Sequence, residues 1–194
     1  MKWTWRAGLA TLAGTLVVAG GVAAKGPKSG LVAQLRGLQE VPVVSTVATG
    51  EFTAVINPGD SSITYHLTYS GLQGNATQAH VHVGQRDVNG GIVIWLCQSA
   101  ANPAPAGIPT VPTCTNGIGD FAGTVTSANV VATPAPPNGG QQIFAGDFAK
   151  VLAAIRAGKA YANVHSNLSP GGEIRGQIKV NGKNNNDDQD QDED

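Results

Sequence analysis

The stretch Ala79-His80-Val81-His82-Val83-Gly84 alternates apolar residues with two histidines. Successive side chains of a β-strand point to opposite faces, so this alternation predicts a strand with both histidines on one face. Their α-carbons would lie about 6.6 Å apart, close enough for both imidazoles to bind one ion. The alternative is that His80 and His82 only line a solvated strand face.

The same period of two continues along the chain, with Gly and Pro between the apolar runs. It predicts an antiparallel all-β domain, a β-sandwich of about seven to nine strands. One short helix is expected at 148–157, with Asp147 as N-cap and Gly158 as its stop. The expected strands are 31–37, 51–57, 62–70, 79–84, 91–97, 121–126, 159–165 and 173–180.

The last two expected strands form a hairpin that carries a third histidine. Alternation places His165 and Asn163 on the polar face of its first arm, and Glu173 and Arg175 on the polar face of its second. A symmetric turn would set His165 opposite Glu173 and Asn163 opposite Arg175. If the histidine strand and this last hairpin are neighbours in the sandwich, we expect His80, His82 and His165 to converge, with Arg175 on the same side but beyond direct ligation. His66 is interpreted as a surface histidine.

The two ends of the chain differ from its body. Residues 1–24 combine a cationic start, an apolar run and small residues, the pattern of a cleaved secretory signal; a retained anchor helix is the alternative. Residues 25–30 would be a linker and 31–180 one domain. The acidic segment 181–194 carries no apolar residue and is expected to be a disordered tail. The protein should be secreted or periplasmic, without a stable membrane anchor once the signal is removed.

Export agrees with the two cysteines, Cys97 and Cys114, an even pair in a chain bound for an oxidising compartment. We expect a disulfide between them, which would close the Pro- and Gly-rich loop 98–119. A loop of about 17 residues closed in this way stabilises a fold by ~3 kcal/mol.

Charge composition argues against one class of partner. The formal net charge is −1, and no concentrated basic face of the kind that binds nucleic acid is apparent. No Ser or Cys stands in a recognisable activating motif, which makes nucleophilic hydrolysis a distant third hypothesis.

Four motifs in order along the chain carry a family resemblance: Leu38-Gln39-Glu40-Val41-Pro42, Ala79-His80-Val81-His82, Ala162-Asn163-Val164-His165 and Pro170-Gly171-Gly172-Glu173-Ile174-Arg175-Gly176-Gln177. Together they resemble the CHRD domain, first described in chordin, over about residues 31–180. The resemblance implies a secreted β-sandwich domain, found singly in bacterial exported proteins and repeated in animal chordins that bind growth factors. A growth-factor role is not carried over to this single-domain chain.

The order of His80-Val81-His82, Val164-His165 and Arg175 also resembles the copper ligands and active-site arginine of copper–zinc superoxide dismutases, which are Greek-key β-sandwiches with a disulfide. This resemblance implies one copper ion on three histidines, with Arg175 attracting superoxide. The chain departs from that family because no histidine lies between His82 and His165, so the bridging and zinc-loop ligands are missing. Turnover is therefore a separate question from metal binding.

Two function classes follow. The first is an extracellular binding or structural module with a three-histidine metal (copper) site at His80, His82 and His165, on an outward-facing surface of the sheet. The second is a copper-dependent redox enzyme of superoxide dismutase type, in which Arg175 would be catalytic. The partner would be an extracellular protein or a small ligand.

Overall fold

The computed structural model describes residue 1, residues 30–133 and residues 140–181. Nearly all of the expected signal segment, most of the linker and nearly all of the acidic tail lie outside these residues. None of the described helices is long and apolar enough to cross a membrane.

Nine strands and one α-helix make up the described fold, which confirms the predicted all-β class with one short helix. The strands are β1 (Gly30–Arg36), β2 (Thr49–Ile56), β3 (Ile63–Ser70), β4 (Ala76–Val83), β5 (Gly91–Cys97), β6 (Gly119–Val125), β7 (Ala160–Ser166), β8 (Ile174–Gln177) and β9 (Lys179–Val180). The helices are α1 (Phe148–Arg156) and the short 3-10 turns η1 (Gly37–Gln39), η2 (Pro58–Asp60) and η3 (Ser127–Asn129).

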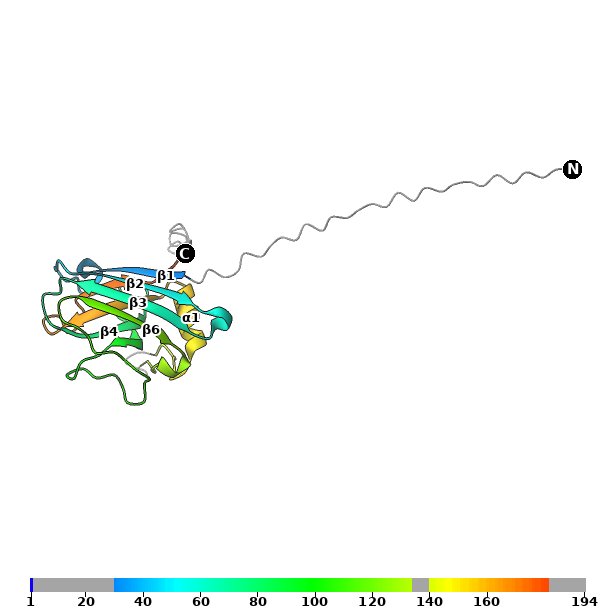
Figure 1. The fold of residues 1–194 in the computed structure, drawn as a ribbon. Helices are drawn as coiled ribbons and strands as arrows, with labels where there is room; N and C mark the ends of the chain where they lie inside the picture. The colour runs from blue at the N-terminus through cyan, green and yellow to red at the C-terminus, as the bar shows by residue number, and fades with distance from the viewer. Residues whose placement is uncertain (2–29, 134–139, 182–194) are drawn as a thin grey trace.

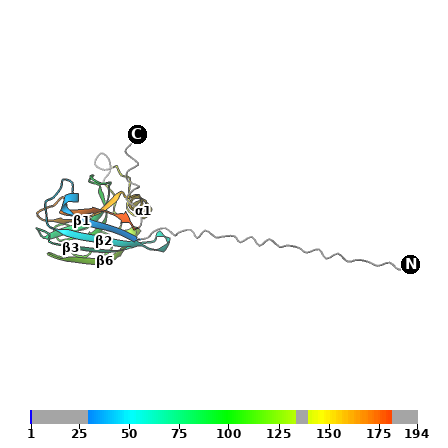
Figure 2. The same ribbon diagram turned by 90° about the horizontal axis from the view of Figure 1, so that it is seen from above.

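The two layers of the sandwich belong to one continuous antiparallel sheet in the order β5-β4-β7-β8-β1-β2-β3-β6, with β9 also paired to β1. Strands β1, β2, β3 and β6 lie side by side in one layer (Figures 1 and 2). The sheet passes to the second layer where Arg36 of β1 pairs with Arg175 of β8. Within the described residues β5 and β6 are not paired with each other, so the fold is an open barrel.

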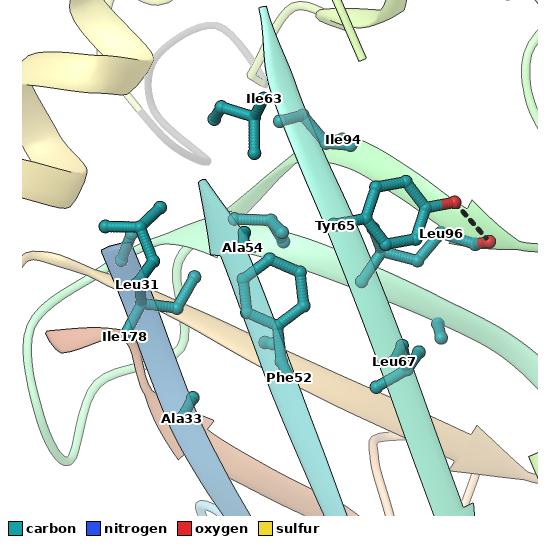
Figure 3. Close-up of a cluster of buried hydrophobic side chains, with 14 of the residues drawn as sticks. Leu31, Ala33, Phe52, Ala54, Ile63, Tyr65, Leu67, Ile94, Leu96 and Ile178 are labelled. Atoms are coloured by element: carbon teal, nitrogen blue, oxygen red, sulfur yellow. Dashed lines mark hydrogen bonds between the residues drawn. The ribbon is translucent and has the colours of Figure 1, made fainter. Parts of the chain in front are cut away.

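Apolar side chains from the two layers meet in the space between them (Figure 3). Phe52 and Tyr65 stack with ring centroids 6.3 Å apart, and the Tyr65 hydroxyl donates to the carbonyl of Leu96 on β5. The alternation in β3 explains the burial pattern, because every second residue from Ile63 to Tyr69 is buried. Burial of such side chains contributes about 1.5–3 kcal/mol each and fixes the register of the strands that carry them, because a shift by one residue would turn them to the other face.

Helix α1 packs at one end of the barrel (Figure 1), and its buried residues are Phe148, Val151, Leu152 and Ile155. Asp147 stands at the expected N-cap position, but its carboxylate accepts from the backbone of Phe144 three residues earlier. Gly158 follows the helix with φ +69°, a conformation that favours glycine and ends the helix.

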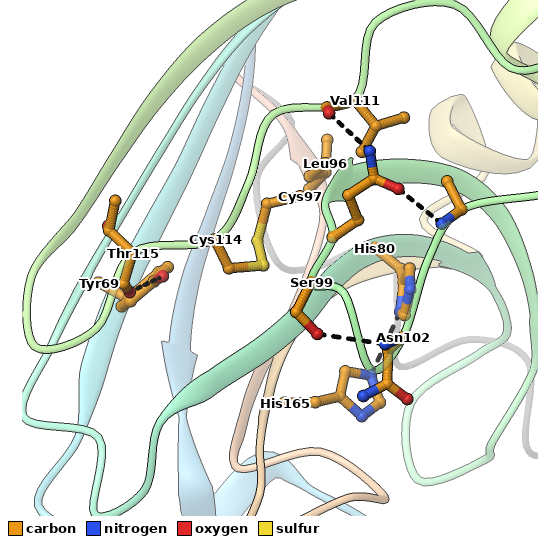
Figure 4. The surroundings of a disulfide bond; sticks show 12 residues. Tyr69, His80, Leu96, Cys97, Ser99, Asn102, Val111, Cys114, Thr115 and His165 are labelled. Atoms are coloured by element: carbon orange, nitrogen blue, oxygen red, sulfur yellow. Dashed lines mark hydrogen bonds between the residues drawn. A yellow bond between two sulfur atoms is a disulfide. The ribbon is translucent and has the colours of Figure 1, made fainter.

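The Cys97–Cys114 disulfide is present, as predicted, and closes the long loop after β5 (Figure 4). Gln98 ties the loop further, since its side chain donates to the carbonyl of Val111 and accepts from the backbone of Ala104. The Tyr69 hydroxyl donates to the carbonyl of Thr115 from the other layer. The disulfide and these hydrogen bonds therefore hold the loop that connects β5 and β6, the two strands at the open edges of the sheet.

Candidate metal centre

The three predicted histidines converge because their strands are neighbours. Strand β4 pairs with β7, and the register sets Gln78 opposite His165 and His80 opposite Asn163. Directly opposite residues of an antiparallel pair share a face, so His80, His82 and His165 lie on one side of the sheet. His80 Nδ1 is 3.3 Å from His165 Nε2 (Figure 4). The potential ligand atoms of all three histidines lie within 4.8 Å of one another.

One part of the prediction was wrong: this face of the sheet is not exposed to solvent. The exposed fractions of His80, His82 and His165 are 0%, 6% and 6%, and Glu173 and Arg175 are also buried. Three connecting segments cover the face, as shown by contacts of Thr46 with Glu173, Gly90 with His82 and Pro170 with His165. Alternation separates the two faces of a strand but does not show which loops cover them.

Backbone carbonyls fix the tautomers of two histidines. His82 Nδ1 lies 3.0 Å from the carbonyl oxygen of Gly90, and His165 Nδ1 lies 2.9 Å from that of Pro170. A carbonyl oxygen only accepts, so each Nδ1 must donate, and in a neutral ring Nε2 then carries the lone pair. Hydrogen bonds of this kind orient histidine ligands in metal sites.

The side chain of Asn163 lies between these two lone pairs. Its Oδ1 is 3.1 Å from His82 Nε2, and its Nδ2 is 2.8 Å from His165 Nε2. One end of an amide donates and the other accepts, so only one of the two ring nitrogens can receive a hydrogen bond from Asn163. In either orientation of the amide, its oxygen lies against a ring nitrogen that carries a lone pair and no hydrogen, so these two atoms are both acceptors. The site therefore has more acceptors than donors, the condition that a bound cation relieves.

His80 adds a further unmet group. Its Nε2 is buried without a hydrogen-bond partner in the described part of the chain, and its ring meets Trp95 edge-on with centroids 4.3 Å apart. Burial lowers the pKa of His80 to about 2, helped by repulsion from His165 and His82. Burial likewise lowers the pKa of His82 to about 4 and also lowers that of His165. All three are thus neutral near pH 7, the form that binds metal ions.

Arg175 lies on the same side of the sheet, because its strand sets it opposite Asn163 as predicted. Its guanidinium carbon is 4.4 Å from the centroid of the Tyr161 ring, and that ring stacks on His82 with centroids 4.7 Å apart. Its Nη1 donates to the carbonyl of Val88 and to Asn89 Oδ1. The Tyr161 ring therefore contacts both Arg175 and His82, and the charge of Arg175 helps to lower the pKa of His82.

Two buried carboxyl groups border the site, and sequence reasoning did not single out the first. Glu40 is 4% exposed and its Oε1 has no hydrogen-bond partner among the described residues. Burial raises the pKa of Glu40 to about 7, although the charge of Arg175 and the backbone of Val41 oppose this shift. Glu173, by contrast, accepts hydrogen bonds from Thr46, Gln73 and Ser166. The only signal for Glu40 was its place in the Leu38–Pro42 motif.

His66 lies elsewhere, on β3 in the other layer. Its side chain is 49% exposed, and Nε2 lies 2.7 Å from Asp120 Oδ1. It is a surface histidine, as predicted, and has no part in the cluster.

Comparison with protein families matches the chain to the model of the CHRD domain over residues 31–178, from β1 to the residue before β9. Comparisons with curated proteins and with solved structures give no significant match.

Proposed function

The chain belongs to the CHRD domain family, and from this premise we propose that it is an exported binding module that holds one copper ion on His80, His82 and His165. The observation that carries the proposal is the convergence of three neutral imidazoles. The residues around them supply fewer hydrogen-bond donors than the lone pairs of their ring nitrogens require.

Ligand chemistry selects copper among the candidate ions. Neutral imidazole suits copper, zinc and nickel, and for a given set of nitrogen ligands the affinity order places copper(II) first. Two donor atoms bound to one ion at bond lengths near 2.0–2.1 Å are about 2.8–3.4 Å apart at tetrahedral or square angles. The 3.3 Å between His80 Nδ1 and His165 Nε2 fits this range.

Export is part of the same proposal. The signal-like residues 1–24 and the Cys97–Cys114 disulfide both favour an oxidising compartment. Secreted or periplasmic placement would expose the domain to an extracellular protein or small ligand as partner.

Equilibrium dialysis of tag-free protein against copper(II), followed by metal analysis, tests the site. We expect one ion per chain in the wild type, and quenching of the emission of Trp95, whose ring contacts His80. His165→Gln should lose both, whereas His66→Gln, on an exposed histidine outside the cluster, should keep both. Absence of binding, or equal binding by His165→Gln that retains its fold by circular dichroism, would refute the proposal.

Copper-dependent superoxide dismutation is the second candidate, supported by Arg175 on the same face as the three histidines. A cation near a metal attracts small anions. The copper-loaded wild type should then dismutate superoxide, and Arg175→Gln should do so more slowly with its copper content unchanged. Copper binding without turnover would leave the binding module alone.

A further inference from the structure

We propose that Asn163 is the fourth ligand of the copper site. Its side-chain oxygen would occupy the coordination position that the three histidines leave open. This inference rests on the proposed metal site and specifies what fills its remaining position.

The position of Asn163 is fixed by its neighbours. Its backbone is opposite His80 on β4 and opposite Arg175 on β8, so it belongs to a strand paired on both sides. Its side chain is 2% exposed and contacts the ring nitrogens of His82 and His165. The amide therefore stands among the ligand atoms, not at their edge.

The contacts of Asn163 must change when an ion binds. His82 Nε2 and His165 Nε2 would give their lone pairs to the metal, so Asn163 Nδ2 would lose its acceptor on His165. A buried amide without partners costs about 1–3 kcal/mol. Coordination of the ion by Oδ1 would satisfy one end of the amide. It would also remove the repulsion between the lone pairs of Oδ1 and His82 Nε2, because both would then point to the ion.

The distance from Asn163 Oδ1 to His82 Nε2 fits this role. It is 3.1 Å, within the separation of about 2.8–3.4 Å expected for two atoms that bind one ion. The resulting set has three nitrogens and one neutral oxygen. Such a set suits copper(II) or zinc(II), while copper(I) prefers sulfur ligands. A position filled by the protein suits retention of an ion better than turnover, because catalytic sites keep an open position for water or substrate.

Asn163→Ala tests the assignment through copper affinity and through relaxation of water protons, which increases when an exchangeable water binds copper(II). The wild-type complex should relax water weakly. Asn163→Ala should bind copper about 10- to 100-fold more weakly, relax water strongly and show an altered electron paramagnetic resonance spectrum. Asn163→Asp has the same shape and adds a charge, so it should bind at least as tightly as wild type and relax water weakly.

Asn129→Ala is the matched control, since Asn129 is buried and bonds with Thr126 and Pro109. It should match the wild type in all three readings. If no protein binds copper, the proposed function itself fails. If the wild type binds copper but relaxes water as strongly as Asn163→Ala, or if the two spectra coincide, the metal site stands and the ligand assignment is overturned. Asn163→Asp decides the same question if Asn163→Ala does not fold, because strong water relaxation by its copper complex overturns the assignment.

Discussion

His80 Nδ1 lies 3.3 Å from His165 Nε2 although 85 positions separate the two residues in the chain. Only the pairing of β4 with β7 brings these nitrogens together, so the site is absent from the unfolded chain. Metal binding and folding are therefore linked.

Copper(II) should stabilise the folded protein for this reason. A ligand present at a hundredfold excess over its dissociation constant adds ~2.7 kcal/mol to the free energy of unfolding. Urea unfolding with and without copper(II) measures this difference in the wild type. In His165→Gln the two curves should coincide, and a copper-induced shift of equal size in that variant would contradict the linkage.

The stability of the metal-free protein should fall as the pH falls below about 6.5. In the folded state the pKa of His82 is about 4 and that of His80 about 2, both below the ordinary value of 6.5. The unfolded chain binds protons at these histidines that the folded chain excludes, so the contribution of the two histidines to stability is complete above pH 6.5 and decreases toward pH 4. Each such histidine contributes a slope of about 1.4 kcal/mol per pH unit in this window. Urea unfolding at several pH values measures the slope. His82→Gln removes one titrating group and should reduce the slope by about 1.4 kcal/mol per pH unit.

Glu40 should have the opposite pH dependence. Its pKa is about 7 in the folded protein against 4.5 ordinarily, so its contribution is complete below pH 4.5 and is lost as the pH rises through 7. Glu40→Gln removes the buried charge and should stabilise the protein at pH 8 by up to about 3 kcal/mol, with little effect at pH 4. Urea unfolding at the two pH values measures this. Glu51→Gln, on an exposed strand position, should change stability by less than about 0.5 kcal/mol at both. Equal effects of Glu40→Gln at pH 4 and pH 8 would contradict the prediction.

The sequence was sufficient for the parts of the site that depend on period-two alternation. It predicted that Asn163 lies opposite Arg175, because a short hairpin leaves few possible registers. It also placed His80, His82 and His165 on polar strand faces, but their convergence depends in addition on the pairing of β4 with β7, which alternation does not give. The burial of this face was not predictable in the same way. It depends on the paths of the segments around Glu40 and Gly90, and irregular segments have no periodicity from which a path follows.

Loss of the Cys97–Cys114 disulfide should destabilise the fold. The bridge spans 17 positions, and closing a loop of this size restricts the unfolded chain by ~3 kcal/mol. Urea unfolding of the Cys97→Ala/Cys114→Ala double variant, compared with the oxidised wild type, measures the loss. The reduced wild type should match the double variant. An unchanged midpoint in the variant would mean that the contacts of Gln98 and Tyr69 hold the loop without the bridge.

Glu173 should be among the most sensitive positions of the fold. Its Oε1 accepts from Thr46 Oγ1 at 2.9 Å and from the backbone of Gln73 at 2.8 Å, and its Oε2 accepts from Ser166 Oγ. Glu173→Ala would leave three donors without an acceptor, at a cost of about 1–3 kcal/mol for each one that stays buried. We expect a loss of at least about 3 kcal/mol in urea unfolding. Glu51→Ala, on an exposed position of β2, should cost less than about 0.5 kcal/mol. A loss below ~1 kcal/mol for Glu173→Ala would contradict the prediction. It would mean that water replaces the carboxylate as acceptor for Thr46, Gln73 and Ser166.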